Sequence, residues 1–333
     1  MNDDLLKWLL NSDPWIEYGT RSELVGQSES DPEVADARKR MVQSPALSGI
    51  IGDLKNWPGQ VLSSHKSARQ PFHKISFIAE LGFNAGDPGI DVISTKMLEH
   101  ISEDGIINLP MNISKSYGGT GSDTWGWALC DAPVNLYTLA KIGLKDDHRI
   151  KSGVGSLAKL IRDNGWPCVV SKELGTFRGP GRKDDPCPYA TLVMLKLLSQ
   201  FGEYLDSSEV RIGIDSLCNL WTDSIKSHPY IFYMGNNFRK LKAPLVWYDI
   251  IHVLDVISRF DYARQKSQTK EMLDIVVAKQ DDEGKYSPES VWQDWKGWDF
   301  GQKSQPSKYL TFLVYRTLKR MEMSKWMCPN PGT

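Results

Sequence analysis

The sequence predicts an all-α protein built from five or six helical hairpins, and three observations predict this class. Apolar residues recur at helical spacing in six segments, namely 33–42, 75–81, 134–142, 192–201, 246–257 and 310–321. Alternating strand patterns of useful length are hard to find. An acidic residue or Asn, a Gly, and then an apolar or aromatic residue recur around Gly105, Gly165 and Gly284. These glycines lie 60 and then 119 residues apart, which indicates units of about 50–60 residues, enough for two helices each.

The elements follow in order along the chain. Residues 1–45 are expected to form an N-terminal helical extension, and residues 1–333 to form a single domain. Inner helices are expected to begin near residues 71, 131, 186, 244 and 306, each close to a proline, and to face a common cavity. Proline is tolerated in a helix only at its first turn, so it marks a helix start.

Composition excludes some classes of protein. The 333 residues include 40 basic and 41 acidic side chains, so no global field attracts nucleic acid. The N-terminus is acidic and no apolar run approaches 18 residues, so we expect a cytoplasmic protein without a membrane span. The five cysteines lack a disulfide-framework spacing, which fits a reducing compartment. The 12 tryptophans suit an aromatic-lined cavity.

The segment 177–189 is the most unusual of the chain, because it places many chemically active side chains just before an apolar helix. A charged helix N-cap is the alternative explanation, but a cap needs only one carboxylate. The segment therefore predicts a site for an anion, a metal or a proton. Its polar residues are Arg178, Arg182, Lys183, Asp184, Asp185, Cys187 and Tyr189.

The repeated turns resemble those of the α/α toroid shared by protein prenyltransferase β subunits and squalene–hopene-type terpene cyclases. The resemblance covers roughly residues 40 to 322. It implies inner helices around an aromatic cavity that takes an isoprenoid or another apolar substrate. Aromatic residues expected to contact that substrate are Trp125, Trp127, Trp247 and Tyr248. An open solenoid of TPR or HEAT type is the structural alternative, although its repeats are usually shorter.

The segment Gly181-Arg182-Lys183, Asp185-Pro186-Cys187 and Tyr189 is similar to the loop Gly-Arg-x-x-Lys-x-x-Asp-x-Cys-Tyr of prenyltransferase β subunits. The resemblance implies that Arg178, Arg182 and Lys183 bind a diphosphate. It also implies that Asp185, Cys187 and His252 bind zinc, which would activate a substrate thiol. The sequence departs from the family in having Arg182 and Lys183 adjacent and in inserting Pro188. If several thiols held the zinc, Cys130 and Cys168 would replace His252.

A second reading uses the same segment differently. Asp184-Asp185, followed by Tyr189-Ala190-Thr191, is similar in placement to the Asp-x-Asp-Asp-Thr-Ala motif of class II terpene cyclases. The resemblance implies that Asp184 or Asp185 protonates an alkene. The first Asp of the motif is absent, and the neighbouring cations favour an ionised carboxylate. A non-enzymatic toroidal binding module is the third reading.

The sequence therefore predicts a prenyltransferase-like or terpene cyclase-like enzyme with Asp184, Asp185 and Tyr189 as catalytic residues. Zinc is the expected cofactor. A small-molecule acceptor is as well supported as a protein one, because protein prenylation in the family needs a separate α subunit as partner.

Overall fold

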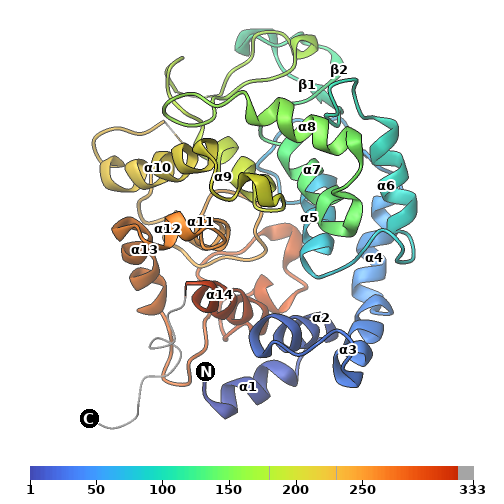
Figure 1. The fold of residues 1–333 in the computed structure, drawn as a ribbon, viewed down its shortest axis with the longest axis vertical. Coiled ribbons are helices and arrows are strands. Elements are labelled where there is room, and N and C mark those ends of the chain that lie inside the picture. The colour runs from blue at the N-terminus through green and yellow to red at the C-terminus, as the bar shows by residue number, and fades with distance from the viewer. Residues whose placement is uncertain (180, 230, 322–333) are drawn as a thin grey trace. The chain divides into compact units, whose positions relative to one another are not determined.

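The computed structural model describes residues 1–179, 181–229 and 231–321 (Figure 1). The chain divides into two compact units. Unit 1 consists of Met1–Ser48 together with the chain from Asn236 onward, and unit 2 is Gly49–Gly235. The single domain expected from the sequence stays a prediction, and each unit is described by itself.

Unit 2 contains three inner helices, and two of them pack against a more exposed partner. Helix α5 packs on α7, and α7 packs on α9. The partners α8 and α10 cover α7 and α9. The inner helices are α5 (Pro71–Glu80), α7 (Ala132–Leu139, continued by a π-helical turn at Ala140–Leu144) and α9 (Pro188–Leu198). The others are α6 (Ile90–Glu99), α8 (His148–Ala158) and α10 (Ser208–Asp223). The residues of α4 (Pro45–Leu54) are divided between unit 1 and unit 2.

Unit 1 has the same kind of packing. Helix α11 packs on α13 and on α14, and α14 also packs on α2. Three helices lie in the N-terminal part of this unit. The helices are α1 (Asp3–Leu10), α2 (Pro14–Gly19, continued at Thr20–Val25), α3 (Pro32–Val42), α11 (Ile250–Ile257), α12 (Asp261–Arg264), α13 (Ser267–Val277) and α14 (Lys308–Arg320).

Burial separates inner from outer helices. Every residue of α7, α9 and α11 is buried, whereas α8, α10 and α13 bury one face only. A helix that is apolar all round must be covered on all sides, and an amphipathic one can cover it. The predicted all-α class is thus confirmed, and inner helices covered by outer ones are found in both units. Closure of the helices into a toroid stays a prediction. The common cavity stays a prediction.

The helix starts confirm four of the five expected positions to within two residues. The exception is α11, which begins at Ile250 and not near residue 244. Residues 244–249 are not helical because the Asp249 side chain caps the helix, its Oδ1 accepting from the His252 N–H at 2.9 Å. Pro244 therefore precedes this helix and does not lie in its first turn.

In both units, an aromatic residue just after a repeated Gly turn makes the same two hydrogen bonds to the start of an inner helix. Gly165 has a φ of 119° and Gly284 of 84°, in the left-handed region that favours glycine. The next residue, Trp166, donates its N–H to Thr191 Oγ1 at 3.1 Å and accepts from the Cys187 N–H at 2.7 Å. In unit 1, the Tyr286 N–H donates to Thr311 Oγ1 at 3.0 Å, and the Tyr286 carbonyl accepts from the Ser307 N–H at 2.9 Å. Tyr286, Ser307 and Thr311 lie 120 residues after Trp166, Cys187 and Thr191, respectively, which confirms the repeat.

Replacing Thr191 with Val should cost about 1–3 kcal/mol of unfolding free energy, because the buried Trp166 N–H then loses its acceptor. Thr311→Val should cost a similar amount through Tyr286. Urea unfolding of both variants measures this. Thr95→Val is the control, because Thr95 is exposed and its Oγ1 donates to the Asp91 carbonyl of its own helix. Costs no larger than that of the control would contradict the shared role.

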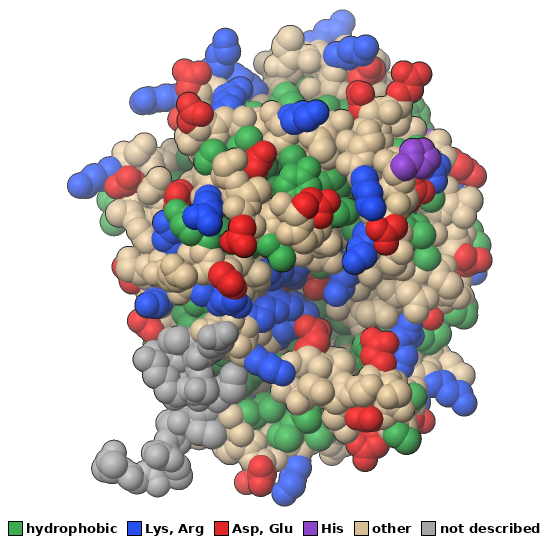
Figure 2. Space-filling view, viewed as in Figure 1, with side chains coloured by type: hydrophobic (Ala, Val, Ile, Leu, Met, Phe, Trp, Pro, Cys, Tyr) green, Lys and Arg blue, Asp and Glu red, His purple; other side chains and the backbone are tan. Residues whose placement is uncertain are grey.

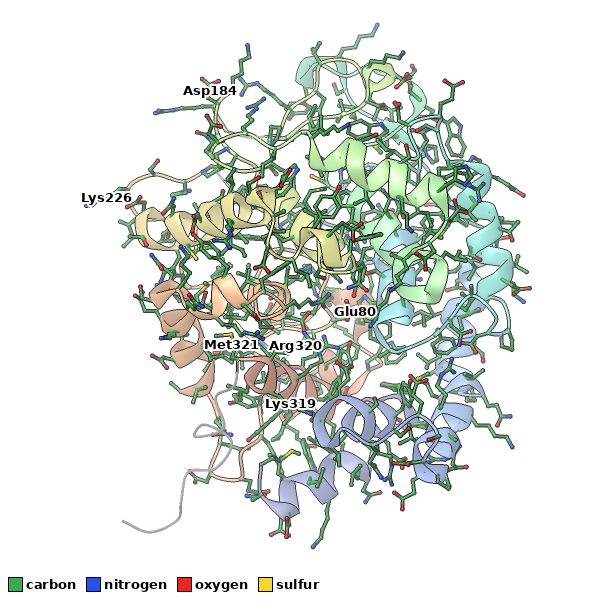
Figure 3. All side chains as sticks on the ribbon, viewed as in Figure 1. Glu80, Asp184, Lys226, Lys319, Arg320 and Met321 are labelled. Atoms are coloured by element: carbon green, nitrogen blue, oxygen red, sulfur yellow. The ribbon has the colours of Figure 1, made fainter. Side chains whose placement is uncertain are left out.

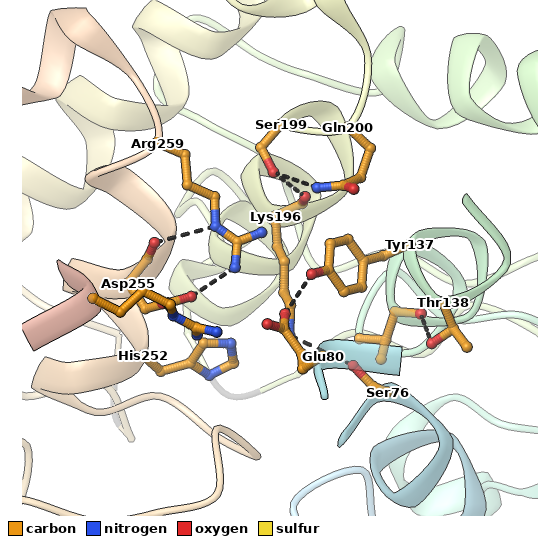
Figure 4. A network of polar contacts seen from close by, with 12 residues as sticks. Ser76, Glu80, Tyr137, Thr138, Lys196, Ser199, Gln200, His252, Asp255 and Arg259 are labelled. Atoms are coloured by element: carbon orange, nitrogen blue, oxygen red, sulfur yellow. Dashed lines mark hydrogen bonds and ion pairs between the residues drawn. The ribbon is translucent and has the colours of Figure 1, made fainter. Parts of the chain in front are cut away.

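A buried ion pair joins the inner helices of unit 2 near their C-terminal ends. Lys196 Nζ of α9 lies 3.1 Å from Glu80 Oε1 of α5, and both side chains are buried (Figure 4). The hydroxyl of Tyr137, on α7, donates to the same carboxylate oxygen. One polar cluster thus links three consecutive inner helices.

Acidic and basic side chains are interspersed on the face shown in Figure 2. This agrees with the formal net charge of −1. Crossing a bilayer takes a longer apolar helix than any found in the described residues.

Candidate active site

Three extended segments lie side by side in unit 2 where the chain enters α7 and α9. Residues 127–129 pair antiparallel with 169–171, through Leu129 N–H to the Val169 carbonyl at 3.0 Å and Ser171 N–H to the Trp127 carbonyl at 2.8 Å. Residues 166–167 pair with 186–187. This pairing gathers side chains from loops that are far apart in sequence.

The Asp131 carboxyl is the most deeply buried acid of this region, with none of its surface exposed. Its Oδ2 lies 2.7 Å from His65 Nε2 and accepts from the Ala128 N–H at 3.2 Å. His65 is itself held by His73, whose Nε2 lies 2.7 Å from the His65 carbonyl oxygen. The other oxygen, Oδ1, is buried and has no hydrogen-bond partner among the described residues.

Asp131 occupies the N-cap position of α7 but does not cap the helix, since its side chain accepts no hydrogen bond from the first turn. The ordinary reason for an aspartate at a helix start is therefore missing. Burial raises the pKa of the Asp131 carboxyl above its usual value, and the hydrogen bond and charge of His65 offset part of that rise. Burial thus shifts Asp131 toward the neutral acid, while two N–H partners on Oδ2 stabilise its charged form.

Two neighbours add polar groups to the site. Asn135, one helical turn after Asp131, is fully buried, and both polar atoms of its side chain lack a hydrogen-bond partner among the described residues. Residues four apart lie on one helix face. Tyr189 is buried at the start of α9, and burial, then the nearby Cys130, Asp131 and Cys187, raise the pKa of its phenol. The predicted catalytic Tyr189 thus lies near Asp131.

Three thiols gather beside these residues. The Cys168 thiol lies near enough to those of Cys130 and Cys187 for each to shift the pKa of the others. Cys168 Sγ also accepts from the Gly179 N–H at 2.9 Å. Cys130, and then Cys187, lowers the pKa of Cys168, while the pKa of Cys130 is raised well above its usual value by the neighbouring thiols and by burial.

Cys187 caps α9, its Sγ accepting from the Ala190 N–H at 3.5 Å. At the equivalent position of unit 1, Ser307 Oγ accepts from the Leu310 N–H at 3.1 Å. Sulfur is a weak acceptor, so capping alone does not explain the cysteine.

The predicted loop lies apart from this buried chemistry. Arg178, Arg182, Lys183 and Asp184 are exposed, and Figure 3 shows Asp184 at the periphery of the molecule. The Arg178 guanidinium donates to the Gly181 carbonyl at 2.8 Å. The half-buried Asp185 closes the turn by accepting from the Arg182 N–H at 2.8 Å. Neither Asp184 nor Asp185 has the burial that a neutral acid requires.

Arg182 and Asp185 instead line a polar cleft of about 600 Å³ against α10. The cleft also carries Asp163, Asp215, Asp223 and Lys226. Its carboxylates outnumber these cations, which disfavours the predicted diphosphate site.

The predicted zinc ligands do not come together as a set within one unit. Asp185 and Cys187 belong to unit 2, and His252 to unit 1, where its Nδ1 lies 2.8 Å from the Trp247 carbonyl oxygen. Among residues 1–321, apart from the two undescribed positions, no three His, Cys, Asp or Glu side chains are arranged to hold a metal ion. Zinc stays a prediction.

The predicted substrate-binding aromatics also belong to different units. Trp125 lies on strand β2 (Asp123–Gly126), which pairs antiparallel with β1 (Leu109–Asn112), and not at the opening of an inner helix. Its ring is 45% exposed and stacks on His100 with 4.3 Å between ring centroids. Trp127 is half-buried in unit 2, whereas Trp247 and Tyr248 lie in unit 1 before α11.

Sequence reasoning did not select His65 and Asp131 as catalytic candidates. A usable signal was present for Asp131, because the N-caps Gln70, Asp131, Cys187, Asp249 and Ser307 recur at the repeat spacing. No comparable signal exists for His65, which lies 66 residues before its partner.

Comparisons with known proteins leave the family open. No family model and no curated protein matches the chain. A crystal structure of a protein from Actinoplanes is 13% identical, with 93% of this chain and 90% of that chain covered and a TM-score of 0.42. The type II terpene cyclase MstE from Scytonema is 8% identical, with 95% and 89% covered and a TM-score of 0.40. Similarities of this size establish neither a family nor an activity for this chain.

Proposed function

We propose that the protein is an acid catalyst that protonates an apolar, isoprenoid-like substrate with the Asp131 carboxyl. One observation supports it above all: the buried Asp131 has Oδ2 held by His65 and Ala128, while Oδ1 has no partner among the described residues. The substrate class rests on the resemblance of the repeated turns to those of terpene cyclases.

The proton transfer follows from this asymmetry. In the neutral acid, Oδ1 carries the proton and donates it to a carbon–carbon double bond of the substrate. The alkene becomes a carbocation, and the electron pair of the broken O–H bond stays on the carboxylate. The His65 Nε2–H and the Ala128 N–H stabilise that charge at Oδ2, where they already lie. Attack of a second double bond of the substrate on that cation closes a ring, and loss of a proton to water from the cyclic cation gives an isomer of the substrate with one double bond fewer.

Burial favours the protonated carboxyl, which an exposed aspartate has lost at neutral pH. A carboxylic acid donates to an alkene only if it remains protonated until the substrate arrives, and desolvation favours the protonated form. Asn135 and Tyr189 would then contact the reacting region, since their buried polar groups flank Asp131. The exposed Asp184 and the half-buried Asp185 take no part.

The experiment is incubation of the purified chain with linear polyprenes, namely squalene, geranylgeraniol and geranylgeranyl diphosphate. Gas chromatography with mass spectrometry should show a product with the elemental composition of its substrate and fewer double bonds. Diphosphate release should be no faster than without protein. Diphosphate release without an isomeric product would refute the proposal and favour the prenyltransferase alternative.

A further inference from the structure

We propose that Asn135 is a specificity-determining residue that binds the hydroxyl group of an uncharged, apolar alcohol. Its side chain belongs to the inner helix α7, one turn after Asp131. Binding of the alcohol is inferred from the burial and the contacts of the Asn135 side chain. That the alcohol is also the molecule protonated by Asp131 rests on the proposed function.

The Asn135 amide is a buried polar group without an internal partner. The residue has none of its surface exposed, and neither Oδ1 nor Nδ2 has a hydrogen-bond partner among the described residues. A buried amide that is left unpaired lowers the stability of the folded chain, and proteins retain such groups mainly at functional sites. The amide therefore indicates a ligand that supplies its hydrogen bonds.

The internal repeat shows that this helix position has a structural role elsewhere in the chain. Asn135 is the fourth residue after the N-cap of α7, as Thr191 is in α9 and Thr311 is in α14. Each threonine accepts, through Oγ1, the N–H of the residue that follows a repeated Gly turn. In the repeat that leads to α7, this N–H belongs to Ile106 and donates to Ser102 Oγ at 3.2 Å. Asn135 does not make the contact that its two equivalents make.

The two polar atoms of the amide select the chemical class of the ligand. Oδ1 accepts a hydrogen bond and Nδ2 donates one. A hydroxyl group can donate to Oδ1 and accept from Nδ2, whereas a hydrocarbon can do neither. An ionised phosphate ester has acceptors only, and its negative charge would lie close to the Asp131 carboxyl. An alcohol therefore fits Asn135 better than a hydrocarbon or a phosphate ester.

The position of Asn135 gives this contact a consequence for the proposed reaction. Residues four apart lie on one face of a helix, so Asn135 and Asp131 share a face of the start of α7. Asp131 Oδ1 is also buried and has no hydrogen-bond partner among the described residues. A hydroxyl group held by Asn135 would thus fix which part of the carbon chain lies beside Asp131 Oδ1.

Binding of saturated isoprenoid chains tests the contact separately from catalysis. The probes are phytanol, phytane, which lacks only the hydroxyl group of phytanol, and phytanyl phosphate. None of them has a double bond that an acid could protonate. The ratio of the phytane Kd to the phytanol Kd should be about 10- to 100-fold larger in the wild type than in Asn135→Leu, because each buried polar atom left unpaired weakens binding. Comparison of the two ratios removes the different solubilities of the probes.

Urea unfolding without a ligand is the structural control. Asn135→Leu keeps the number of side-chain heavy atoms and removes no internal hydrogen bond, so it should be at least as stable as the wild type. Thr191→Val, at the equivalent position of α9, should be less stable. A cost of Asn135→Leu as large as that of Thr191→Val would show a structural role and overturn the proposal.

Three binding results would also overturn the proposal. They are equal Kd ratios in the wild type and Asn135→Leu, tightest binding of phytanyl phosphate, and no binding of any probe. A larger ratio in the wild type would support the alcohol site even if no polyprene gave an isomeric product, in which case only the proposed function would fail.

Discussion

Asp131→Asn should lower the turnover of a polyprene substrate by about 100- to 10,000-fold, the range typical of losing a positioned general acid. Asparagine has nearly the same shape and can still accept from His65 and Ala128, but its amide cannot donate a proton of sufficient acidity. Initial rates with purified protein measure the effect, and circular dichroism checks that the helices remain.

Asp249→Asn is the matched control for this loss. Asp249 is also a buried aspartate at an inner-helix N-cap, and burial raises its pKa to about 7. Its Oδ1 is engaged in capping α11, which gives it a structural role that Asp131 lacks. Turnover of Asp249→Asn should stay within about threefold of wild type at a temperature where both proteins are folded. A large loss of turnover in Asp249→Asn, together with normal turnover in Asp131→Asn, would show that Asp131 is not the catalytic acid.

The pH dependence of the wild type follows from the same chemistry. Because burial raises the pKa of Asp131, the active protonated form is present below that pKa and is lost as the pH rises through it. Turnover should therefore fall on the alkaline side of the profile. A rate that increases with pH over that range would contradict an acid role.

Asp255→Asn should lower the unfolding free energy by about 3–5 kcal/mol, the largest effect on stability that we expect from a single polar substitution. The fully buried Asp255 carboxylate accepts from Arg316 at 2.6 Å, from Arg259 at 2.7 Å and from Arg320 at 3.0 Å. Figure 4 shows the contact with Arg259. Asp255→Asn leaves the three guanidinium groups close together without the carboxylate charge that offsets their mutual repulsion.

Asp261→Asn tests the same chemistry at the surface of the same unit. Asp261 forms an ion pair with Arg264, but its side chain is 76% exposed, so the pair should contribute at most about 1 kcal/mol. Urea unfolding of both variants gives the comparison. Similar costs for Asp255→Asn and Asp261→Asn would show that the buried network is not a main source of stability.

The fold was largely predictable because it depends on local signals. Apolar runs such as 192–201 mark helices that are buried all round, and a Gly turn must precede each hairpin at a fixed spacing. The start of α11 was not predictable from Pro244, because a side-chain cap at Asp249 decides it.

The candidate site was predicted only in part, because its chemistry depends on burial and not on residue type. Tyr189 and Cys187 were selected, and they lie beside Asp131. Most charged residues of the same segment are exposed, and a sequence cannot tell an exposed Asp184 from a buried Asp131. The contact between His65 and Asp131 arises from the packing of two loops, which no local pattern encodes.

The most direct measurement is the deuterium content of the product formed in D₂O. Proton donation from Asp131 to the substrate predicts one deuterium per product molecule, bound to a carbon of the double bond that is first protonated, because the carboxyl proton exchanges with solvent before each turnover. Asp131→Asn should give no product above the rate without protein. Product formed in D₂O without deuterium, or labelled product formed equally fast by Asp131→Asn, would contradict acid catalysis by this residue.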